Sequence, residues 1–262
     1  DGTTVVFRFE GDGGIYAVDL ADADPEAGMW QVSPDDGDYR YGPEVGDGWV
    51  VCKVERYDVA DWIYDIEAYD LSDPAADPVV IPGHYASSAD WIEYDGPSTD
   101  AGKVVYQKSG YWDYTGDAAL ERGYAIMLYD LATDNEVQIS SVGANSFNRE
   151  HPVINDGLVS WHDKRSGYVE VYIYDLAAEM ESCLVDSDSS AYAGRTTTAD
   201  GIVAWHDHRP GDADDSSSDI YAEFVDSTPP AAAADAYGTV TGNPLSVAAP
   251  GVLANDTDPE DD

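Results

Sequence analysis

Two short runs of residues hold the densest groups of side chains that could do chemistry in this sequence. They are His162, Asp163 and Arg165, and then His206, Asp207, His208 and Arg209. Side chains two residues apart lie on one face of a strand, so each Asp can pair with the Arg two positions later. We therefore predict that Asp163 pairs with Arg165 and Asp207 with Arg209, as ion pairs that recur with the repeat. The alternative is a metal or general-base site built on histidine.

The histidines of the two runs occupy the same position in consecutive repeats, just past a strand in each, so His162 and His206 could approach each other. Catalysis would also need a nucleophile or a third ligand, which the sequence does not identify. His84 and His151 stand alone in the sequence, and we interpret both as structural.

Acidic clusters are candidate calcium sites, because calcium prefers oxygen ligands. Two lie in expected loops, at 186–188 and 212–219, and none of the clusters matches an EF-hand loop. The strongest candidate is the C-terminal cluster of Asp256, Asp258, Glu260 and Asp261. Calcium is the one cofactor that these residues suggest.

Aromatic side chains gather in the long insertions of the second and third repeats. They are Tyr57, Trp62 and Tyr64, and then Tyr111, Trp112 and Tyr114. Aromatic residues on loops above a rigid scaffold are typical of surfaces that bind carbohydrate or protein. Alternatively, these rings only cover the ends of the sheets.

The charge of the chain excludes some partners. Its 262 residues contain 12 Lys and Arg against 53 Asp and Glu, a net charge of −41. Such a field repels nucleic acids and anionic membranes, and it is typical of proteins from halophilic sources, where salt screens the repulsion. No apolar run is long enough for a membrane span in this segment. Cys52 and Cys183 are far apart in the sequence and are expected to be buried free thiols.

Two patterns alternate five times along the chain. The first is a Gly followed by a β-branched pair and a ring or thiol, as in Gly157 to Trp161; the second resembles Val171 to Leu176. The second pattern recurs about every 45 to 60 residues, at Ile15, Ile66, Ile126, Val171 and Ile220. Short segments rich in Val, Ile, Tyr and Trp, separated by Asp-Gly turns, predict antiparallel strands.

We therefore predict an all-β fold over residues 1–226, a β-propeller of at least five four-stranded blades. The first and last repeats are incomplete. Two arrangements remain open, a five-bladed ring closed by its two ends and a truncated ring of six to eight blades. The second is favoured because the sequence starts within a blade.

The run Trp161-His162-Asp163-Lys164-Arg165-Ser166-Gly167, followed by Val171 to Leu176, resembles the TolB-like and archaeal surface-protein propeller repeats. The run from Trp205 to Arg209, with Asp219-Ile220-Tyr221, resembles them again, whereas the first three repeats lack the Trp-x-Asp-x-Arg element. The resemblance implies a propeller and a secreted or surface location, without implying one activity.

The C-terminal segment resembles a second family. The run Gly251-Val252-Leu253-Ala254-Asn255-Asp256-Thr257-Asp258 is similar to the start of cadherin-like and VCBS-type modules. The resemblance implies that residues 235–262 begin an Ig-like β-sandwich domain, joined to the propeller by a linker at 227–234. Calcium between domains is a frequent property of such modules.

Three functions follow from these observations. The first is a non-enzymatic recognition or adhesion scaffold, extracellular or on the cell surface, that binds a glycan or protein. The second is the propeller of a secreted polysaccharide-degrading enzyme or peptidase, which needs at least three polar groups converging in one cleft. It fails if His162 and His206 lie on opposite rims or in salt-bridged positions between blades. The third is a structural spacer of a surface layer, for which no aromatic or polar pocket is expected.

Overall fold

The computed structural model describes residues 3–10, 13–22, 24–25, 28–58, 61–83, 92–112, 121–141, 149–185, 192–208 and 219–225. Within these ranges the regular structure consists of strands, so the predicted all-β class is confirmed. None of the described residues belongs to a helix with the length and apolarity that crossing a membrane requires. The predicted linker and the expected Ig-like segment at 235–262 lie outside the described residues.

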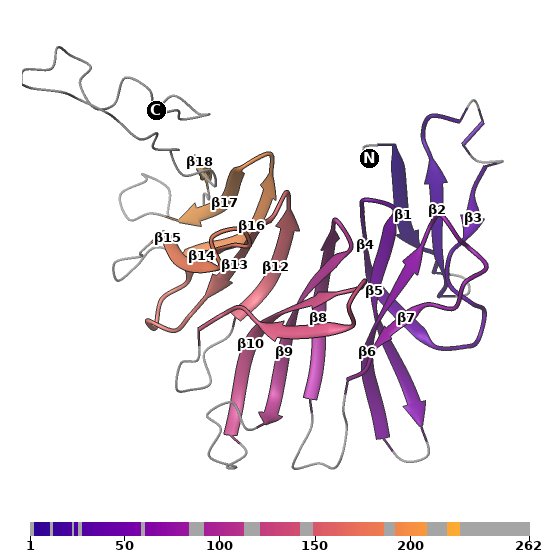
Figure 1. The fold of residues 1–262 in the computed structure, drawn as a ribbon, viewed down its shortest axis with the longest axis horizontal. Helices are drawn as coiled ribbons and strands as arrows, with labels where there is room; N and C mark the ends of the chain where they lie inside the picture. Colours follow the sequence, from indigo (N-terminus) through magenta and orange to yellow (C-terminus); the bar gives the residue numbers. More distant parts are fainter. Residues whose placement is uncertain are drawn as a thin grey trace, which may run out of the picture.

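Five antiparallel sheets follow one another along the chain (Figure 1). The first sheet contains β1 (Thr4–Arg8), β2 (Ile15–Asp19) and β3 (Trp30–Gln31). The second contains β4 (Tyr39–Gly46), β5 (Trp49–Asp58), β6 (Asp61–Asp70) and β7 (Val79–Ile81). The third contains β8 (Ile92–Asp100), β9 (Lys103–Trp112), β10 (Glu121–Asp130) and β11 (Asn135–Gln138).

The fourth sheet contains β12 (Arg149–Asn155), β13 (Leu158–Asp163), β14 (Glu170–Asp175) and β15 (Met180–Val185). The fifth contains β16 (Tyr192–Ala199), β17 (Ile202–His208) and β18 (Asp219–Phe224). Each sheet keeps its strands in chain order, so every connection within a sheet joins neighbours. These are the five units that the repeats predict, with four strands in the middle three sheets and three described strands in the first and last.

The turn between the first two strands of a sheet explains the recurring glycine. In the second sheet, Asp47 and Gly48 have φ of 47° and 82°, and in the fourth sheet Asp156 and Gly157 have φ of 47° and 77°. Two successive positive φ angles define the type I′ turn that matches the twist of a hairpin. The Gly carbonyl then accepts a hydrogen bond from the Leu of the Asp-Leu pair, as Gly157 does from Leu176 at 2.9 Å. Both repeated patterns therefore meet at one end of each sheet.

Apolar side chains fill the space between consecutive sheets. Val105 and Ile126 of the third sheet pack with Val159 and Trp161 of the fourth, and similar clusters join the other neighbouring sheets. Trp161 is fully buried. Its ring stacks on Tyr172 across the β13–β14 ladder, with centroids 6.0 Å apart, and Trp205 stacks on Tyr221 in the same register at 6.2 Å.

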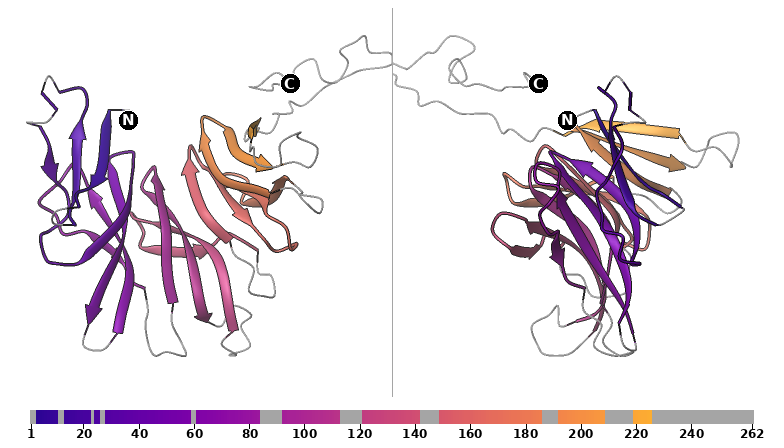
Figure 2. Two further views of the ribbon diagram at one scale, coloured as in Figure 1. Left: turned by 180° about the vertical axis from the view of Figure 1, so that it is seen from behind. Right: turned by 90° about the vertical axis from the view of Figure 1, so that its right-hand side faces the viewer.

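The sheets are arranged as a fan in chain order (Figures 1 and 2). Their first strands meet on the inner side, where β4 contacts β8, β8 contacts β12, and β12 contacts β16. Sheets that stand side by side with one strand each toward a common centre are the blades of a β-propeller. The predicted fold class is therefore present over the described part of the chain.

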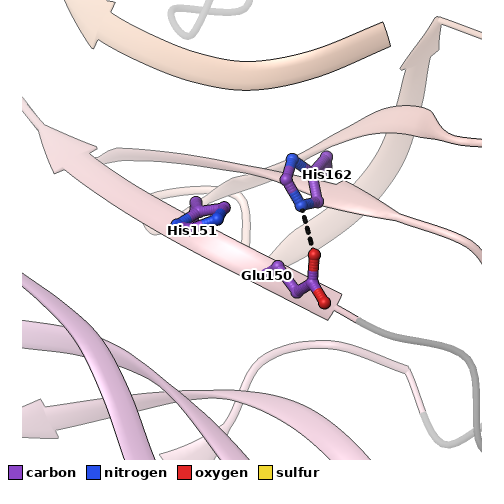
Figure 3. A group of neighbouring side chains, drawn as sticks. All are labelled: Glu150, His151 and His162. Atoms are coloured by element: carbon purple, nitrogen blue, oxygen red, sulfur yellow. Dashed lines mark hydrogen bonds and ion pairs between the residues drawn. The ribbon is translucent and has the colours of Figure 1, made fainter. Parts of the chain in front are cut away.

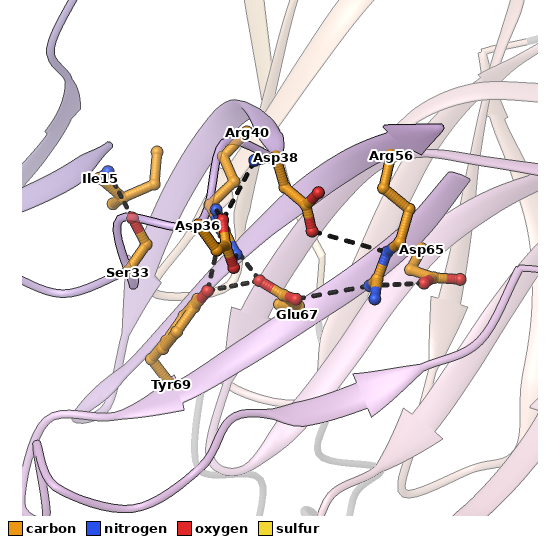
Figure 4. A network of polar contacts seen from close by, with 9 residues as sticks. All are labelled: Ile15, Ser33, Asp36, Asp38, Arg40, Arg56, Asp65, Glu67 and Tyr69. Carbon is orange, nitrogen blue, oxygen red and sulfur yellow. Dashed lines mark hydrogen bonds and ion pairs between the residues drawn. The ribbon is translucent and has the colours of Figure 1, made fainter. Parts of the chain in front are cut away.

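A buried network of charges joins the loop before β4 to the second sheet (Figure 4). Arg40 is 1% exposed, and its guanidinium donates to Glu67 at 3.0 Å and to Asp36 at 2.8 Å. Burial alone would lower the pKa of Arg40, but Asp36, Tyr69 and Glu67 outweigh it and raise that pKa. Arg40 therefore stays charged where a lone cation would be costly.

One expectation about the cysteines is wrong. Cys52 is buried, as predicted, but Cys183 is exposed. Cys183 lies on β15, the outermost strand of its sheet, where no further sheet covers the side chain.

The Arg40 network yields a stability prediction. Arg40→Met should lower the free energy of unfolding by about 3 kcal/mol, because it leaves the buried Glu67 carboxylate without its partner. Lys103→Met is the matched control, since it breaks the half-exposed pair with Asp130 and should cost less than about 1 kcal/mol. Denaturant unfolding of both variants measures the difference, and equal losses would contradict the structural role of Arg40.

Candidate functional site

The inner strands share one irregularity. The pairing of β4, β8, β12 and β16 with the next strand slips between Tyr41 and Glu44, Asp95 and Ser98, Glu150 and Val153, and Gly194 and Thr197. At each slip two residues oppose a single residue of the next strand, and these pairs are Gly42-Pro43, Gly96-Pro97, His151-Pro152 and Arg195-Thr196. The first residue of each pair has a positive φ, of 53°, 54°, 54° and 43° in that order. We call these four pairs the inner bulges.

The inner bulges surround a cavity of about 410 Å³. Its lining comes from all four inner strands and consists of Gly42, Glu44, Gly96, Pro97, Ser98, His151, Pro152, Val153, Arg195, Thr196 and Thr197. A volume of this size is typical of sites for small ligands. Because strands rather than loops supply the lining, the position of the cavity is fixed by the sheets.

Two of the inner bulges hold side chains where the other two hold glycine. A non-glycine residue with positive φ costs about 1–2 kcal/mol, because its Cβ crowds the carbonyl oxygen. His151 also precedes a proline, which restricts its backbone further. Residues held in such conformations are concentrated at functional sites. His151 and Arg195 are therefore the strongest candidates for functional residues on the inner side.

Glu44 contributes a carboxyl group to the same cavity from β4. Its partial enclosure raises the pKa of this carboxyl above its ordinary value, because the charged form loses solvation. The cavity therefore combines a permanent cation at Arg195, an imidazole at His151 and an acceptor at Glu44.

Beside the cavity, His162 is buried and makes two hydrogen bonds. Figure 3 shows the one to Glu150. Its Nδ1 accepts the backbone N–H of Arg195 at 3.2 Å, so the ring proton is assigned to Nε2, which donates to the Glu150 carboxylate at 2.9 Å. Burial lowers the pKa of His162, although the hydrogen bond to Glu150 acts in the opposite direction. His162 is therefore a neutral group that joins the fourth sheet to an inner bulge of the fifth.

Glu150, His151 and His162 lie close enough together to be considered as a metal site, with possible ligand atoms within 4.8 Å of one another. The bonding of His162 argues against this use. A metal on Nε2 needs a lone pair there, while the N–H of Arg195 already occupies the lone pair of Nδ1. A neutral imidazole has one such lone pair, so metal binding would break the bond between the sheets.

In the first polar run, Asp163 and Arg165 form an ion pair. Asp163 is fully buried and accepts hydrogen bonds from Arg165 at 2.8 Å and from the indole of Trp161 at 3.2 Å, and it also pairs with Arg149 at 3.1 Å. Trp-x-Asp-x-Arg is thus a structural unit whose Asp accepts hydrogen bonds from the Trp and the Arg and also forms an ion pair with Arg149. The expectation that the histidines lie just past a strand is wrong, because His162 and His206 lie within β13 and β17.

His151 is not the lone histidine that the sequence suggests, since its ring centroid lies 5.0 Å from that of His162. The bulge brings the two rings together from neighbouring strands.

In the second run, Asp207 is buried and His206 is half-buried, whereas Arg209, His84 and Tyr114 lie outside the described residues. The loop clusters at 186–188 and 212–218, and the calcium candidates Asp256, Asp258, Glu260 and Asp261, also lie outside them.

The aromatic residues of the second unit belong to strands rather than to loops. Tyr57 and Trp62 lie opposite each other on β5 and β6, with an edge-to-face contact at 5.5 Å, and are 63% and 42% exposed. The Lys53 ammonium lies 4.9 Å from the centre of the Tyr64 ring. Both strands have ten residues where β13 and β14 have six, so the insertion extends the hairpin. Tyr111 and Trp112 end β9, and their side chains are outside the described set.

Sequence reasoning did not single out Glu44 or Arg195 and interpreted His151 as structural. A signal was present, because a proline recurs a few residues before the glycine turn in three repeats, at Pro43, Pro97 and Pro152. Proline lacks the N–H that a strand ladder needs, so its recurrence inside expected strands indicates bulges.

No family model matches the sequence, and no curated protein does either. Solved structures do match it. A prolyl endopeptidase aligns with a TM-score of 0.54 and 11% identity over 87% of this chain and 34% of its own. The β-propeller domain of the Trilobed protease from Pyrococcus furiosus aligns with a TM-score of 0.51 and 13% identity, over 79% of this chain and 60% of that domain.

A putative TolB from Agrobacterium tumefaciens aligns with a TM-score of 0.48 and 13% identity, over 82% of this chain and 69% of its own. At these identities, structural likeness shows the fold alone. The alignment with the propeller domain of the Trilobed protease, together with the five sheets described above, confirms the expected β-propeller at the level of the fold.

The strained bulge residues give a stability prediction. Arg195→Gly should raise the free energy of unfolding by about 0.5–1 kcal/mol, because glycine adopts a positive φ without strain but loses more entropy on folding. Gly96→Ala is the reverse control and should lower it by about 1 kcal/mol, since the nearest atoms are 3.9 Å from the added Cβ and only the backbone is strained. Denaturant unfolding tests both, and a loss of stability in Arg195→Gly would contradict the assignment of strain.

His162 gives a prediction about pH. The unfolded chain takes up a proton at this residue near pH 6.5, whereas the lowered pKa keeps the folded form neutral. Stability from His162 is therefore present above that pH and is lost as the pH falls below it. The free energy of unfolding should fall less between pH 7.5 and pH 5.5 in His162→Gln than in the wild type. Equal slopes would show that His162 is not held neutral.

Proposed function

We propose that this protein is a non-enzymatic recognition module that binds a glycan in the cavity between the inner bulges, outside the cell or on its surface. The observation that carries the proposal is that His151 and Arg195 occupy strained backbone positions at this cavity. The fold does not need these side chains, since glycine serves at the equivalent positions of two other blades. Binding of a ligand by these two side chains explains why their backbone strain is retained.

The size of the cavity favours a glycan over a protein partner. A volume of about 410 Å³ suits one or two sugar-sized groups, whereas a stable protein interface needs about 800 Å² from each partner. Ser98, Thr196 and Thr197 add hydroxyl groups to the lining, and Pro97 and Pro152 add apolar surface. This mixture suits the polar edges and apolar faces of sugars.

The bonding of His162 favours recognition over catalysis. Both ring nitrogens are engaged, with Glu150 on one side and the backbone of Arg195 on the other. The bond to Glu150 lies within the fourth sheet and the bond to the Arg195 N–H joins it to the fifth, so both ring nitrogens serve structural hydrogen bonds. The third function, a structural spacer of a surface layer, is also disfavoured, because a spacer needs no polar cavity and this protein has one.

A glycan array tests the proposal. Thr197→Trp places a large ring into the cavity from an exposed position and should reduce binding of glycans at least tenfold. Val137→Trp, at an exposed position on β11 away from the cavity lining, is the matched control and should bind as the wild type does. The array is read in both low and high NaCl, because the net charge of −41 makes the fold sensitive to salt.

Two results would contradict the proposal. An absence of glycan binding by the wild type in both buffers would exclude glycan recognition. Binding that survives Thr197→Trp but is lost in Trp62→Ala would move the site to the exposed aromatic pair of the β5–β6 hairpin.

A further inference from the structure

Arg195 differs from the other cations of this protein. Most Lys and Arg side chains that the structure describes form salt bridges, namely those of Arg40, Lys53, Arg56, Lys103, Lys108, Arg149, Lys164 and Arg165. Arg8 lies over the ring of Tyr41 at 4.8 Å. The Arg195 side chain is exposed at the cavity and forms no salt bridge with any described residue.

The absence of an acidic partner is informative in a chain with 53 acidic and 12 basic residues. Carboxylates are abundant on every blade, yet among the described residues none lies within salt-bridge distance of this guanidinium. The planar set of donors on a guanidinium matches a carboxylate in a two-pronged contact. A cation that has no acidic partner among the described residues, and that lies at a cavity at the cost of backbone strain, is suited to bind an anionic group of a ligand.

The other residues of the cavity lining restrict which anionic ligand can bind. Thr196 is 6% exposed, and its Oγ1 has no hydrogen-bond partner among the described residues. Ser98 and Thr197 add further hydroxyls, and Glu44 adds an acceptor on the opposite end of the row of inner strands. A ligand that fits these groups carries hydroxyls for Glu44 and Thr196 as well as a negative group for Arg195.

The net charge of the protein favours a carboxylate ligand over a phosphate or sulfate ligand. A field from a net charge of −41 opposes every anion, and it opposes a doubly charged phosphate more than a singly charged carboxylate. One guanidinium offsets one charge. The ligand group that fits best is therefore a single carboxylate on a hydroxylated ring.

From these observations we infer that the cavity binds an acidic sugar, with the carboxylate of a uronic acid residue on Arg195 and its hydroxyls on Glu44 and Thr196. This inference rests on the proposed function, since it names the class of glycan that the same cavity selects. It assigns to Arg195 the role of the residue that determines specificity.

Calorimetry with matched sugars tests the inference on the full chain. Methyl glucuronide and methyl galacturonide should bind at least tenfold more tightly than methyl glucoside and methyl galactoside, which differ from them by the carboxylate. Arg195→Gln should reduce uronide affinity at least tenfold and leave the affinity for neutral sugars unchanged. Lys103→Gln is the matched control, because it removes a cation that pairs with Asp130 and is not part of the lining, and its uronide affinity should equal that of the wild type.

Arg195→Gly separates binding from folding. This variant is expected to be more stable than the wild type, so its loss of uronide binding cannot be attributed to unfolding. Thr197→Trp should abolish the binding of all four sugars.

Three outcomes would overturn the inference. Equal affinity for uronides and neutral sugars, with both lost in Thr197→Trp, would overturn the assignment of Arg195 and leave the proposed glycan site in place. N-acetylglutamate that binds as tightly as the uronides, with the same dependence on Arg195, would show a general carboxylate site without preference for sugars. Failure of every glycan on the array would overturn the proposed function together with the inference.

Discussion

Packing of apolar side chains between neighbouring sheets holds this protein together, because each sheet buries its faces against the sheets beside it. Val105 and Ile126 on one sheet and Trp161 on the next belong to one cluster, and neither sheet could bury these residues alone. The stability of such an array is approximately a sum of terms between neighbours. Residues outside these interfaces, at the ends and inner edges of the sheets, are less constrained by folding.

The inner bulges lie at these inner edges, where folding restricts the residue type less but the geometry of the converging strands restricts the backbone. Strands from neighbouring sheets converge toward the centre, and a bulge bends the strand and increases its local twist. The bulge residues leave the ladder, so their side chains are directed by the backbone and not by pairing. Rigid sheets thus position the cavity, and His162 ties two of them together through Glu150 and the main chain of Arg195.

The periodic features of the fold could be predicted from the sequence because they depend on local rules. Asp-Gly pairs specify type I′ turns, and alternating Val, Ile and Tyr specify strands, so the five units were placed correctly. The candidate site depended on distant contacts. Asp163 looks like the polar end of a strand, yet it is fully buried because Arg149, fourteen residues earlier, and Trp161 satisfy it together with Arg165. Likewise, no local property of Arg195 indicates a positive φ, since arginine seldom adopts it.

The four inner bulges share one type of backbone irregularity and differ in their side chains. Each sets two residues against one on the next strand, has a positive φ at its first residue, and lies outside the apolar clusters that stabilise the blades. A change of residues within a bulge alters the chemistry of the cavity while the cores keep their composition. Repeats of this kind therefore offer four separate positions at which a point substitution can change ligand specificity. The protein can still fold after such a substitution, because the cores are unchanged.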